Sequence, residues 1–359
     1  MKKVLIETHH LYYWPNFLPV VQEMLKRGTY DIYVSMPVRS SLTQENILSN
    51  ACESAKISFL SAETEDKRIK KLNDESFDVI IVGNVGQLNK ISSSRALVVM
   101  VYHGIGLKQS YYTDIDPRVD IRSVESVARF NELKSHGHDN IVLTGYTKLD
   151  RLVNLSNPEI KFTNKKPELD PDKKSVLYAP SFYPTSIDKL HPYLLELSQD
   201  HNIIIKLHGF GWEQKKYQYQ NSLCSELSKK SNSIHLLQNE DYDIIPFYLS
   251  ADMLISDISS TLFEYLPMDK PIIQAQCYNL KFKHRIFKKR FWKKMDIDRQ
   301  DNVDFAYQIV EADDILGMVY YAMDNHDEMS TKRKEATEHY LYKVDGNASS
   351  RLIDAIEAY

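Results

Sequence analysis

The sequence predicts an α/β protein built from two doubly wound domains that face each other across a cleft. The chain has 359 residues, a length that favours two hydrophobic cores over one. Short apolar runs alternate with amphipathic segments in two successive series along the chain. Runs that are apolar on both faces are typical of parallel strands covered by helices. Because ligands bind beyond the carboxyl ends of such strands, the residues after each run are candidates for a functional site.

The first domain is expected over residues 1–155 and should be Rossmann-like. Its predicted strands are KVLIE, DIYVSMP, FDVIIVG, RALVVMVY and NIVLTG, and FLPVVQEMLKRG is a predicted helix after the first of them. Prolines and charges replace the apolar rhythm over residues 156–174, which are therefore the predicted linker.

The second Rossmann-like domain is expected over residues 175–335. Its predicted strands are SVLYAPS, NIIIKLHG, SIHLLQ, DMLISD and KPIIQAQ, with LHPYLLELSQDH as an intervening helix. Residues 336–359 predict a C-terminal helix, because Leu352, Ile353 and Ile356 share one side of it. This helix closes the second domain or crosses back to the first.

Composition excludes several classes of protein. With 45 Lys and Arg against 49 Asp and Glu, the net charge of −4 argues against a surface built for nucleic acid. The three cysteines lack CxxC spacing, so neither a disulfide framework nor a zinc site is expected. No apolar run has the length of a signal peptide core or a membrane span, which predicts a cytoplasmic protein that is at most peripheral to a membrane. No metal and no cofactor are expected, because the usual binding motifs are absent.

A histidine and two glycines, His103, Gly104 and Gly106, follow the predicted strand RALVVMVY. The glycines let a ligand approach the backbone closely, and an imidazole at the rim of a sheet can take a proton from an attacking hydroxyl. A histidine held by local hydrogen bonds is the alternative interpretation.

The predicted strand NIIIKLHG leads to Lys206 and His208, which share one strand face. An ammonium and an imidazole that point to one place suit a phosphate. The alternative is a solvated edge of the strand.

A polar turn from Asp257 to Thr261 follows the predicted strand DMLISD. A short helix should begin there, with Thr261 and Glu264 at the spacing of a capping box. Backbone N–H groups at this helix start, with the hydroxyls of Ser259, Ser260 and Thr261, predict an anion site. Serines also cap helices that bind no ligand, and that interpretation stays open.

A basic and aromatic segment extends from Leu280 to Lys294, and it contains eight Lys or Arg among Phe, Ile and Trp residues. Such a mixture suits an anionic membrane surface or a polyanionic acceptor. A solvated basic helix that packs through its aromatic residues is the alternative.

Six stretches, taken in order, resemble motifs of the CDP-glycerol glycerophosphotransferase family, whose members prime and polymerise teichoic acids. They are HGIGLK, TGYTKLDRL, VLYAPS, IIIKLHG, LISDISSTLFEYLPMDKPII and VDGNASSRL. The resemblance runs from about Val99 to the C-terminus. It implies a GT-B architecture, with the acceptor on the side of the first domain and the nucleotide donor held mainly by the second.

The resemblance also implies roles for individual residues. His103 matches the family's base, and His208 matches a histidine that contacts the donor diphosphate, so both are predicted to be catalytic. The donor-binding residues are predicted to be Lys206, Asp257, Ser259, Ser260, Thr261 and Glu264. Further residues expected near the cleft are Gly104, Lys108, Lys148, Asp150, His10 and Ser181.

The predicted reaction is transfer of glycerol phosphate, or a related alditol phosphate, from CDP-glycerol to an acceptor hydroxyl with release of CMP. The acceptor is expected to be lipid-linked or a glycan, and the product a teichoic-acid-like or capsular polymer. Two alternatives remain. One is a GT-B glycosyltransferase or epimerase that uses a nucleotide sugar, and the other is an assembly subunit that docks through the basic and aromatic segment.

Overall fold

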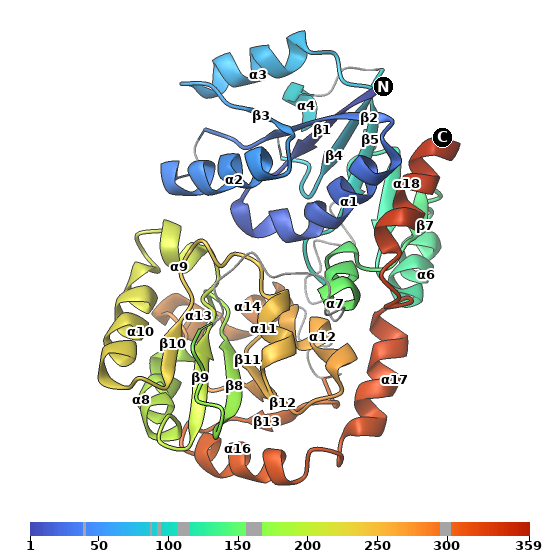
Figure 1. The fold of residues 1–359 in the computed structure, drawn as a ribbon. Coiled ribbons are helices and arrows are strands. Elements are labelled where there is room, and N and C mark those ends of the chain that lie inside the picture. Colours follow the sequence, from blue (N-terminus) through green and yellow to red (C-terminus); the bar gives the residue numbers. More distant parts are fainter. Residues whose placement is uncertain (39–40, 87, 92–94, 106–114, 156–166, 295–302) are drawn as a thin grey trace. The chain divides into compact units, whose positions relative to one another are not determined.

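The computed structural model describes residues 1–38, 41–86, 88–91, 95–105, 115–155, 167–294 and 303–359. The chain divides into two compact units (Figure 1). Met1–Gly104, Tyr111–Asn154 and Tyr340–Tyr359 form unit 1, and Leu155–His339 makes up most of unit 2. Lys108, one of the residues predicted near the cleft, and the first part of the predicted linker lie outside the described residues.

Unit 1 contains a parallel sheet of seven strands in the order β3-β2-β1-β4-β5-β6-β7. Its strand order reverses beside β1, which is the pattern of a doubly wound fold. Strand β4 is buried at every residue, and the last four residues of β1 are buried as well. The strands are β1 (Lys2–Glu7), β2 (Tyr30–Ser35), β3 (Ser58–Leu60), β4 (Val79–Val82), β5 (Leu97–Val101), β6 (Ile121–Val124) and β7 (Ile141–Leu143).

Most helices of unit 1 connect successive strands, as parallel pairing requires, and the last two follow the final strand of the sheet. They are α1 (Trp14–Arg27), α2 (Leu42–Ser54), α3 (Glu65–Asp74), α4 (Leu88–Ile91), α6 (Val127–Ser135), α7 (Asp150–Leu155) and α18 (Ala348–Ala358), with the short 3-10 helices η1 (Leu11–Tyr13) and η2 (Thr147–Leu149).

Unit 2 contains a parallel sheet of six strands in the order β10-β9-β8-β11-β12-β13. Its strands are β8 (Lys174–Ala179), β9 (His201–Ile205), β10 (Ile234–Leu236), β11 (Met253–Ser256), β12 (Ile272–Ala275) and β13 (Tyr307–Ile309). Its helices are α8 (Ile187–Leu197), α9 (Phe210–Glu213), α10 (Gln218–Lys230), α11 (Ile245–Ser250), α12 (Thr261–Glu264), α13 (Phe282–Ile286), α14 (Lys288–Lys294), α16 (Asp314–Asp324) and α17 (Ser330–Tyr340), with η3 (Leu266–Met268). Two parallel, doubly wound sheets confirm the predicted α/β class.

The C-terminal segment forms two helices, where the sequence predicted one over residues 336–359. Helix α17 ends at Tyr340, and α18 then packs beside α1 of unit 1. Leu352, Ile353 and Ile356 are almost fully buried on the inner side of α18.

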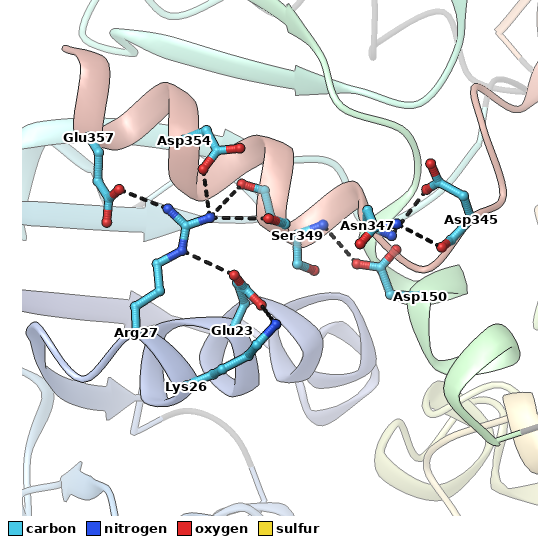
Figure 2. Close-up of polar contacts among 10 residues, drawn as sticks. Glu23, Lys26, Arg27, Asp150, Asp345, Asn347, Ser349, Asp354 and Glu357 are labelled. Atoms are coloured by element: carbon cyan, nitrogen blue, oxygen red, sulfur yellow. Dashed lines mark hydrogen bonds and ion pairs between the residues drawn. The ribbon is translucent and has the colours of Figure 1, made fainter. Parts of the chain in front are cut away.

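Arg27, in the last turn of α1, links the two packed helices through its guanidinium group. Nε bonds Glu23 at 3.0 Å, while Nη2 and Nη1 bond Asp354 and Glu357 on α18 at 2.6 and 2.8 Å (Figure 2). The same guanidinium reaches both oxygens of Ser350, each at 3.1 Å. These bonds fix α18 along α1 within unit 1.

Candidate functional site

His103 lies just beyond the end of β5, in unit 1, and its imidazole is half-buried. Its Nδ1 lies 3.0 Å from the carbonyl oxygen of Gly83, which follows the neighbouring strand β4. A carbonyl oxygen can only accept, so Nδ1 must carry the proton. In the neutral ring Nε2 is then the nitrogen with a lone pair, and it is the one that can take up a proton.

Aromatic residues of η1 hold the His103 ring in place. The Tyr13 ring stacks on the imidazole, with 3.9 Å between centroids and 13° between planes, and the Tyr12 ring meets it edge-on at 6.1 Å. Gly83 makes this packing possible, because a Cβ atom there would lie 2.8 Å from the Tyr13 ring. His10, predicted near the cleft, stacks on Tyr12 at 5.2 Å and so belongs to the same cluster.

Lys206 and His208 follow β9 in unit 2, where the sequence predicted a phosphate site. Both side chains are half-buried, and Lys206 Nζ donates to the carbonyl oxygen of Leu207 at 3.2 Å. His208 Nδ1 accepts a hydrogen bond from the backbone N–H of Phe210 at 3.1 Å. That nitrogen is therefore unprotonated, and Nε2 of the neutral ring carries the proton. The Phe182 and Phe210 rings lie 4.8 and 4.9 Å from the imidazole and orient it.

The turn after β11 is organised by its hydroxyl groups. Ser256 Oγ donates to the carbonyl oxygen of Ala179 at 2.6 Å and shares a hydrogen bond with Thr261 Oγ1 at 2.7 Å. Ser259 Oγ accepts from the Thr261 N–H at 3.3 Å. Ser259, Ser260 and Thr261 are all half-buried at the start of the four-residue helix α12.

The predicted capping box between Thr261 and Glu264 is wrong. The Thr261 hydroxyl pairs with Ser256, and the Glu264 carboxylate accepts from Tyr248 Oη at 2.9 Å and Ser260 Oγ at 3.1 Å. Glu264 is 1% exposed. The Glu264 carboxylate therefore supports the turn through Tyr248 and Ser260, and its predicted place among the donor-binding residues stays a prediction.

Asp257 is fully buried and holds the loop that follows β8. Its Oδ2 accepts from the backbone N–H groups of Ser181 at 3.0 Å and Ser186 at 3.1 Å, and the Ser186 hydroxyl donates to Oδ1. Burial raises the pKa of Asp257 to about 7, although these hydrogen bonds act in the opposite direction. The structure therefore makes Asp257 and Ser181 partners in fixing a loop. The carboxylate of Asp257 thus has a structural role, and the prediction that Asp257 belongs to the donor-binding residues stays a prediction.

Asp150, which the sequence predicted to lie near the cleft, bonds the backbone at the start of a helix. Asp150 is 4% exposed, and its carboxylate accepts from the backbone N–H of Ala348 at 2.9 Å. It also accepts from the backbone N–H of Ser349 at 2.7 Å (Figure 2). These are orphan donors at the start of α18, so Asp150 caps that helix from another part of the chain. The neighbouring Lys148 is half-buried in η2, and Gly104 is buried next to His103.

The basic and aromatic segment forms α13 and α14. Its side chains Phe282, Ile286 and Phe287 are 77%, 60% and 64% exposed, whereas Phe291 stacks on His284 at 4.5 Å. Within the described residues, no helix is both long enough and apolar enough to cross a bilayer.

The family described as CDP-glycerol:poly(glycerophosphate) glycerophosphotransferase matches residues 122–358 of the chain. A curated relative, the teichoic acid poly(glycerol phosphate) polymerase of Staphylococcus epidermidis, is 26% identical over 187 residues. That match covers 51% of this chain and 23% of the polymerase, so the chain spans about a quarter of that relative's length.

Two solved structures are similar over almost the whole chain. The wall teichoic acid polymerase TagF, in a variant soaked with CDPG, has a TM-score of 0.70 at 16% identity, covering 99% of this chain and 88% of its own. MnaA of S. aureus, in a structure with UDP, has a TM-score of 0.65 at 16% identity, covering 100% and 97%. These likenesses confirm the predicted GT-B fold.

Proposed function

The chain belongs to the CDP-glycerol:poly(glycerophosphate) glycerophosphotransferase family, and from this premise we propose that it transfers glycerol phosphate, or a related alditol phosphate, from CDP-glycerol to an acceptor hydroxyl. CMP leaves, and the product is part of a teichoic-acid-like or capsular polymer. The acceptor is lipid-linked or a glycan.

One observation carries this proposal: the backbone assigns opposite tautomers to the two histidines. His103 donates through Nδ1 to a carbonyl, which leaves Nε2 as a proton acceptor. His208 accepts through Nδ1 from an amide, which leaves Nε2–H as a donor. A general base needs an unprotonated Nε2, as in His103, and a phosphate ligand needs a protonated Nε2 that can donate, as in His208.

In the proposed reaction the acceptor oxygen attacks the distal phosphorus of CDP-glycerol. A new P–O bond forms as the bond between this phosphorus and the CMP oxygen breaks, and His103 Nε2 takes the proton of the attacking hydroxyl. Lys206 and His208 donate to the diphosphate and stabilise the charge that develops on the CMP oxygen. Ser259 and Ser260 contribute hydroxyl groups to the same anion. No step requires a further co-reactant.

The test is nucleotide release from a panel of CDP-alditols and nucleotide sugars by the purified chain. Release of CMP from a CDP-alditol in the presence of an acceptor supports the proposal. Release of UDP from a nucleotide sugar, or epimerisation of that sugar, with none from CDP-alditols would overturn it. The exposed His326, which lies 3.3 Å from Asp327, provides a matched histidine control, since His326→Ala should turn over as the unmodified protein does.

We also propose that the chain works in the cytoplasm at the inner face of the cell membrane, held there by Leu280–Lys294. The exposed Phe282, Ile286 and Phe287 can insert among headgroups while the cations of the segment attract anionic lipid. Sedimentation with phosphatidylglycerol vesicles at low salt should carry the protein down. Phe287→Ser should reduce binding, and Leu42→Ser, at a 71% exposed position in unit 1, should leave it unchanged. Absence of sedimentation would refute the membrane proposal.

A further inference from the structure

An open pocket of about 350 Å³ lies within unit 2, beside the residues proposed to bind the donor. Its lining comes from the loop after β8 and the start of α8, from the segment that leads into the start of α10, and from the segment before α13 together with α13 itself. None of its lining residues belongs to the turn Asp257–Thr261, and neither Lys206 nor His208 takes part. The pocket is therefore separate from the proposed diphosphate ligands.

Three tyrosines, Tyr183, Tyr217 and Tyr219, form much of the wall. The Tyr183 hydroxyl accepts from the backbone N–H of Lys281 at 3.1 Å and shares a hydrogen bond with His284 Nδ1 at 2.6 Å. The Tyr219 hydroxyl donates to Asp188 at 2.9 Å. These bonds fix two of the rings before any ligand binds, which lowers the conformational entropy lost on binding.

Three cations, Lys216, Lys281 and Arg285, also line the pocket. Lys281 Nζ lies 4.7 Å from the Tyr183 ring centre and 5.3 Å from that of Tyr217, and Lys216 Nζ lies 4.7 Å from the Tyr217 ring centre. The ring faces place these ammonium groups without using their N–H donors.

Within the part of the chain that the structure describes, no salt bridge neutralises these three cations. Arg285 bonds the carbonyl oxygen of Leu280 at 2.6 Å and the amide oxygen of Asn279 at 2.5 Å. The contacts given for the two lysines are with tyrosine rings, and the single carboxylate in the lining is Asp188. The lining therefore has an excess of two positive charges, which favours an anionic ligand.

The size of the pocket and the chemistry of its walls indicate which class of ligand fits it. A volume of about 350 Å³ lies in the range of small-molecule sites, about 300–1,000 Å³, and exceeds what a lone phosphate fills. Ammonium and guanidinium groups match phosphate oxygens, and the phenol and amide groups match the hydroxyls of a polyol. Together they fit an alditol phosphodiester.

The pocket adjoins the proposed donor site through Phe182. This ring lies 4.8 Å from His208 and 5.2 Å from the pocket residue Tyr217, and Phe182 directly precedes Tyr183 in the chain. A polymer unit in the pocket would thus lie next to the residues that hold the donor. On the basis of the proposed function, we propose that this pocket binds a phosphodiester unit of the alditol phosphate acceptor chain, so that unit 2 holds part of the acceptor in addition to the first domain, where the resemblance placed it.

The test is calorimetric titration of the full chain with soluble poly(glycerol phosphate) that carries no lipid. We expect Lys216→Ala and Lys281→Ala each to weaken binding about tenfold, or about 1.4 kcal/mol, with CDP-glycerol affinity unchanged. Lys229→Ala removes the same charge from α10 outside the pocket and should bind polymer as the unmodified protein does. Thermal melts of each variant control for folding.

Further titrations separate the possible ligands. Glycerol alone should not bind in the pocket, and inorganic phosphate should compete weakly. If the variants lose affinity only for CDP-glycerol, the pocket belongs to the donor. If they lose affinity only for phosphatidylglycerol vesicles and not for the soluble polymer, it binds a lipid headgroup. Either result, or unchanged polymer binding in both variants, would overturn the inference.

The binding measurement also distinguishes failure of the inference from failure of the proposed function. A chain that releases no CMP from CDP-glycerol but binds polymer through Lys281 would refute the activity and retain the pocket. A chain that releases CMP while Lys281→Ala binds polymer normally would refute the pocket alone.

Discussion

Replacement of Asp150 by alanine tests whether this residue caps α18 or acts in the reaction. Asp150→Ala leaves two buried backbone N–H groups, those of Ala348 and Ser349, without their acceptor. Each unsatisfied buried donor costs about 1–3 kcal/mol. The variant also no longer buries a carboxylate, whose desolvation raises the pKa of Asp150 and offsets part of the loss. Two unsatisfied donors together cost about 2–6 kcal/mol, and the recovered desolvation places the expected loss near the lower part of that range, at about 3 kcal/mol. This exceeds the range of about 0.5–2 kcal/mol that is typical for loss of an N-cap, because the cap is buried and doubly bonded.

The assay is differential scanning calorimetry of the purified chain, in which the transition of unit 1 should shift. For domains of about 150–250 residues, each kcal/mol lowers the melting temperature by about 2–4 °C, which predicts a fall of about 6–12 °C. Asp345→Ala is the matched control, since this partly exposed carboxylate near the same helix start pairs with Arg351 at 2.9 Å. It should cost at most about 1 kcal/mol. A normal melting temperature in Asp150→Ala, combined with loss of turnover, would refute the capping role.

Three further predictions concern Arg27, Asp257 and the two histidines. Arg27→Lys should lower the free energy of unfolding of unit 1 by about 1–2 kcal/mol, because an ammonium cannot keep all the bonds to α18 that the guanidinium makes; calorimetry measures this loss, and 1 M salt should shrink it. Burial raises the pKa of Asp257 to about 7, above the unfolded value of about 3.9. The native state therefore binds one more proton than the unfolded state between about pH 4 and 7, and the contribution of Asp257 to stability falls as the pH rises through that window. The free energy of unfolding in urea should depend less on pH in Asp257→Asn, and an equal pH dependence in both proteins would contradict the assignment. His103→Ala should release CMP about 10²–10⁴-fold more slowly and still bind CDP-glycerol, whereas His208→Ala should bind the donor more weakly. Calorimetric titration measures the binding and CMP release measures the rate, and turnover at the unmodified rate in His103→Ala would exclude His103 as the base.

The sheets were predictable because burial on both faces leaves a strong pattern in the sequence. All ten predicted strands occur, and the structure adds β3, β6 and β13. Two of these have three residues, and β6, IRSV, contains Arg122. That arginine is 1% exposed, and its Nη2 donates to the carbonyl oxygen of Asp116 at 2.6 Å. This buried arginine interrupts the apolar run that sequence analysis relies on.

The roles of the acidic residues were not predictable, because their partners are distant in the sequence. Asp150 binds residues 198 and 199 positions further along, and Asp257 binds the Ser181 amide 76 positions earlier. Local sequence shows an acid after a strand in both cases. Such a carboxylate can face a ligand or satisfy a loop, and only the fold decides between the two.

The pocket lined by Tyr183, Lys216 and Lys281 also escaped sequence analysis. Its residues come from three segments, and the segment Leu280–Lys294 was interpreted by itself as a membrane or polyanion surface. The stretch KKYQY, residues 215–219, has the same mixture of cations and aromatics in a shorter form. Combining the two signals required the fold that brings them together.

The polar residues that follow the strands form two groups, which differ in burial and in hydrogen bonding: one group supports the loops, and the other can take part in the reaction. Asp257 and Glu264 are buried with hydrogen-bonded carboxylates, so their contribution is to fix the backbone of the loops around them. His103 and His208 are half-buried, and one nitrogen of each is bound by the backbone, which determines the protonation state of the other. An imidazole can serve as a base or as a phosphate ligand only if that second nitrogen has a defined state and direction. In unit 2 the buried acids fix the loops around the proposed donor-binding residues. In unit 1 the stacked Tyr13 ring and the Gly83 carbonyl oxygen fix the orientation and the tautomer of His103.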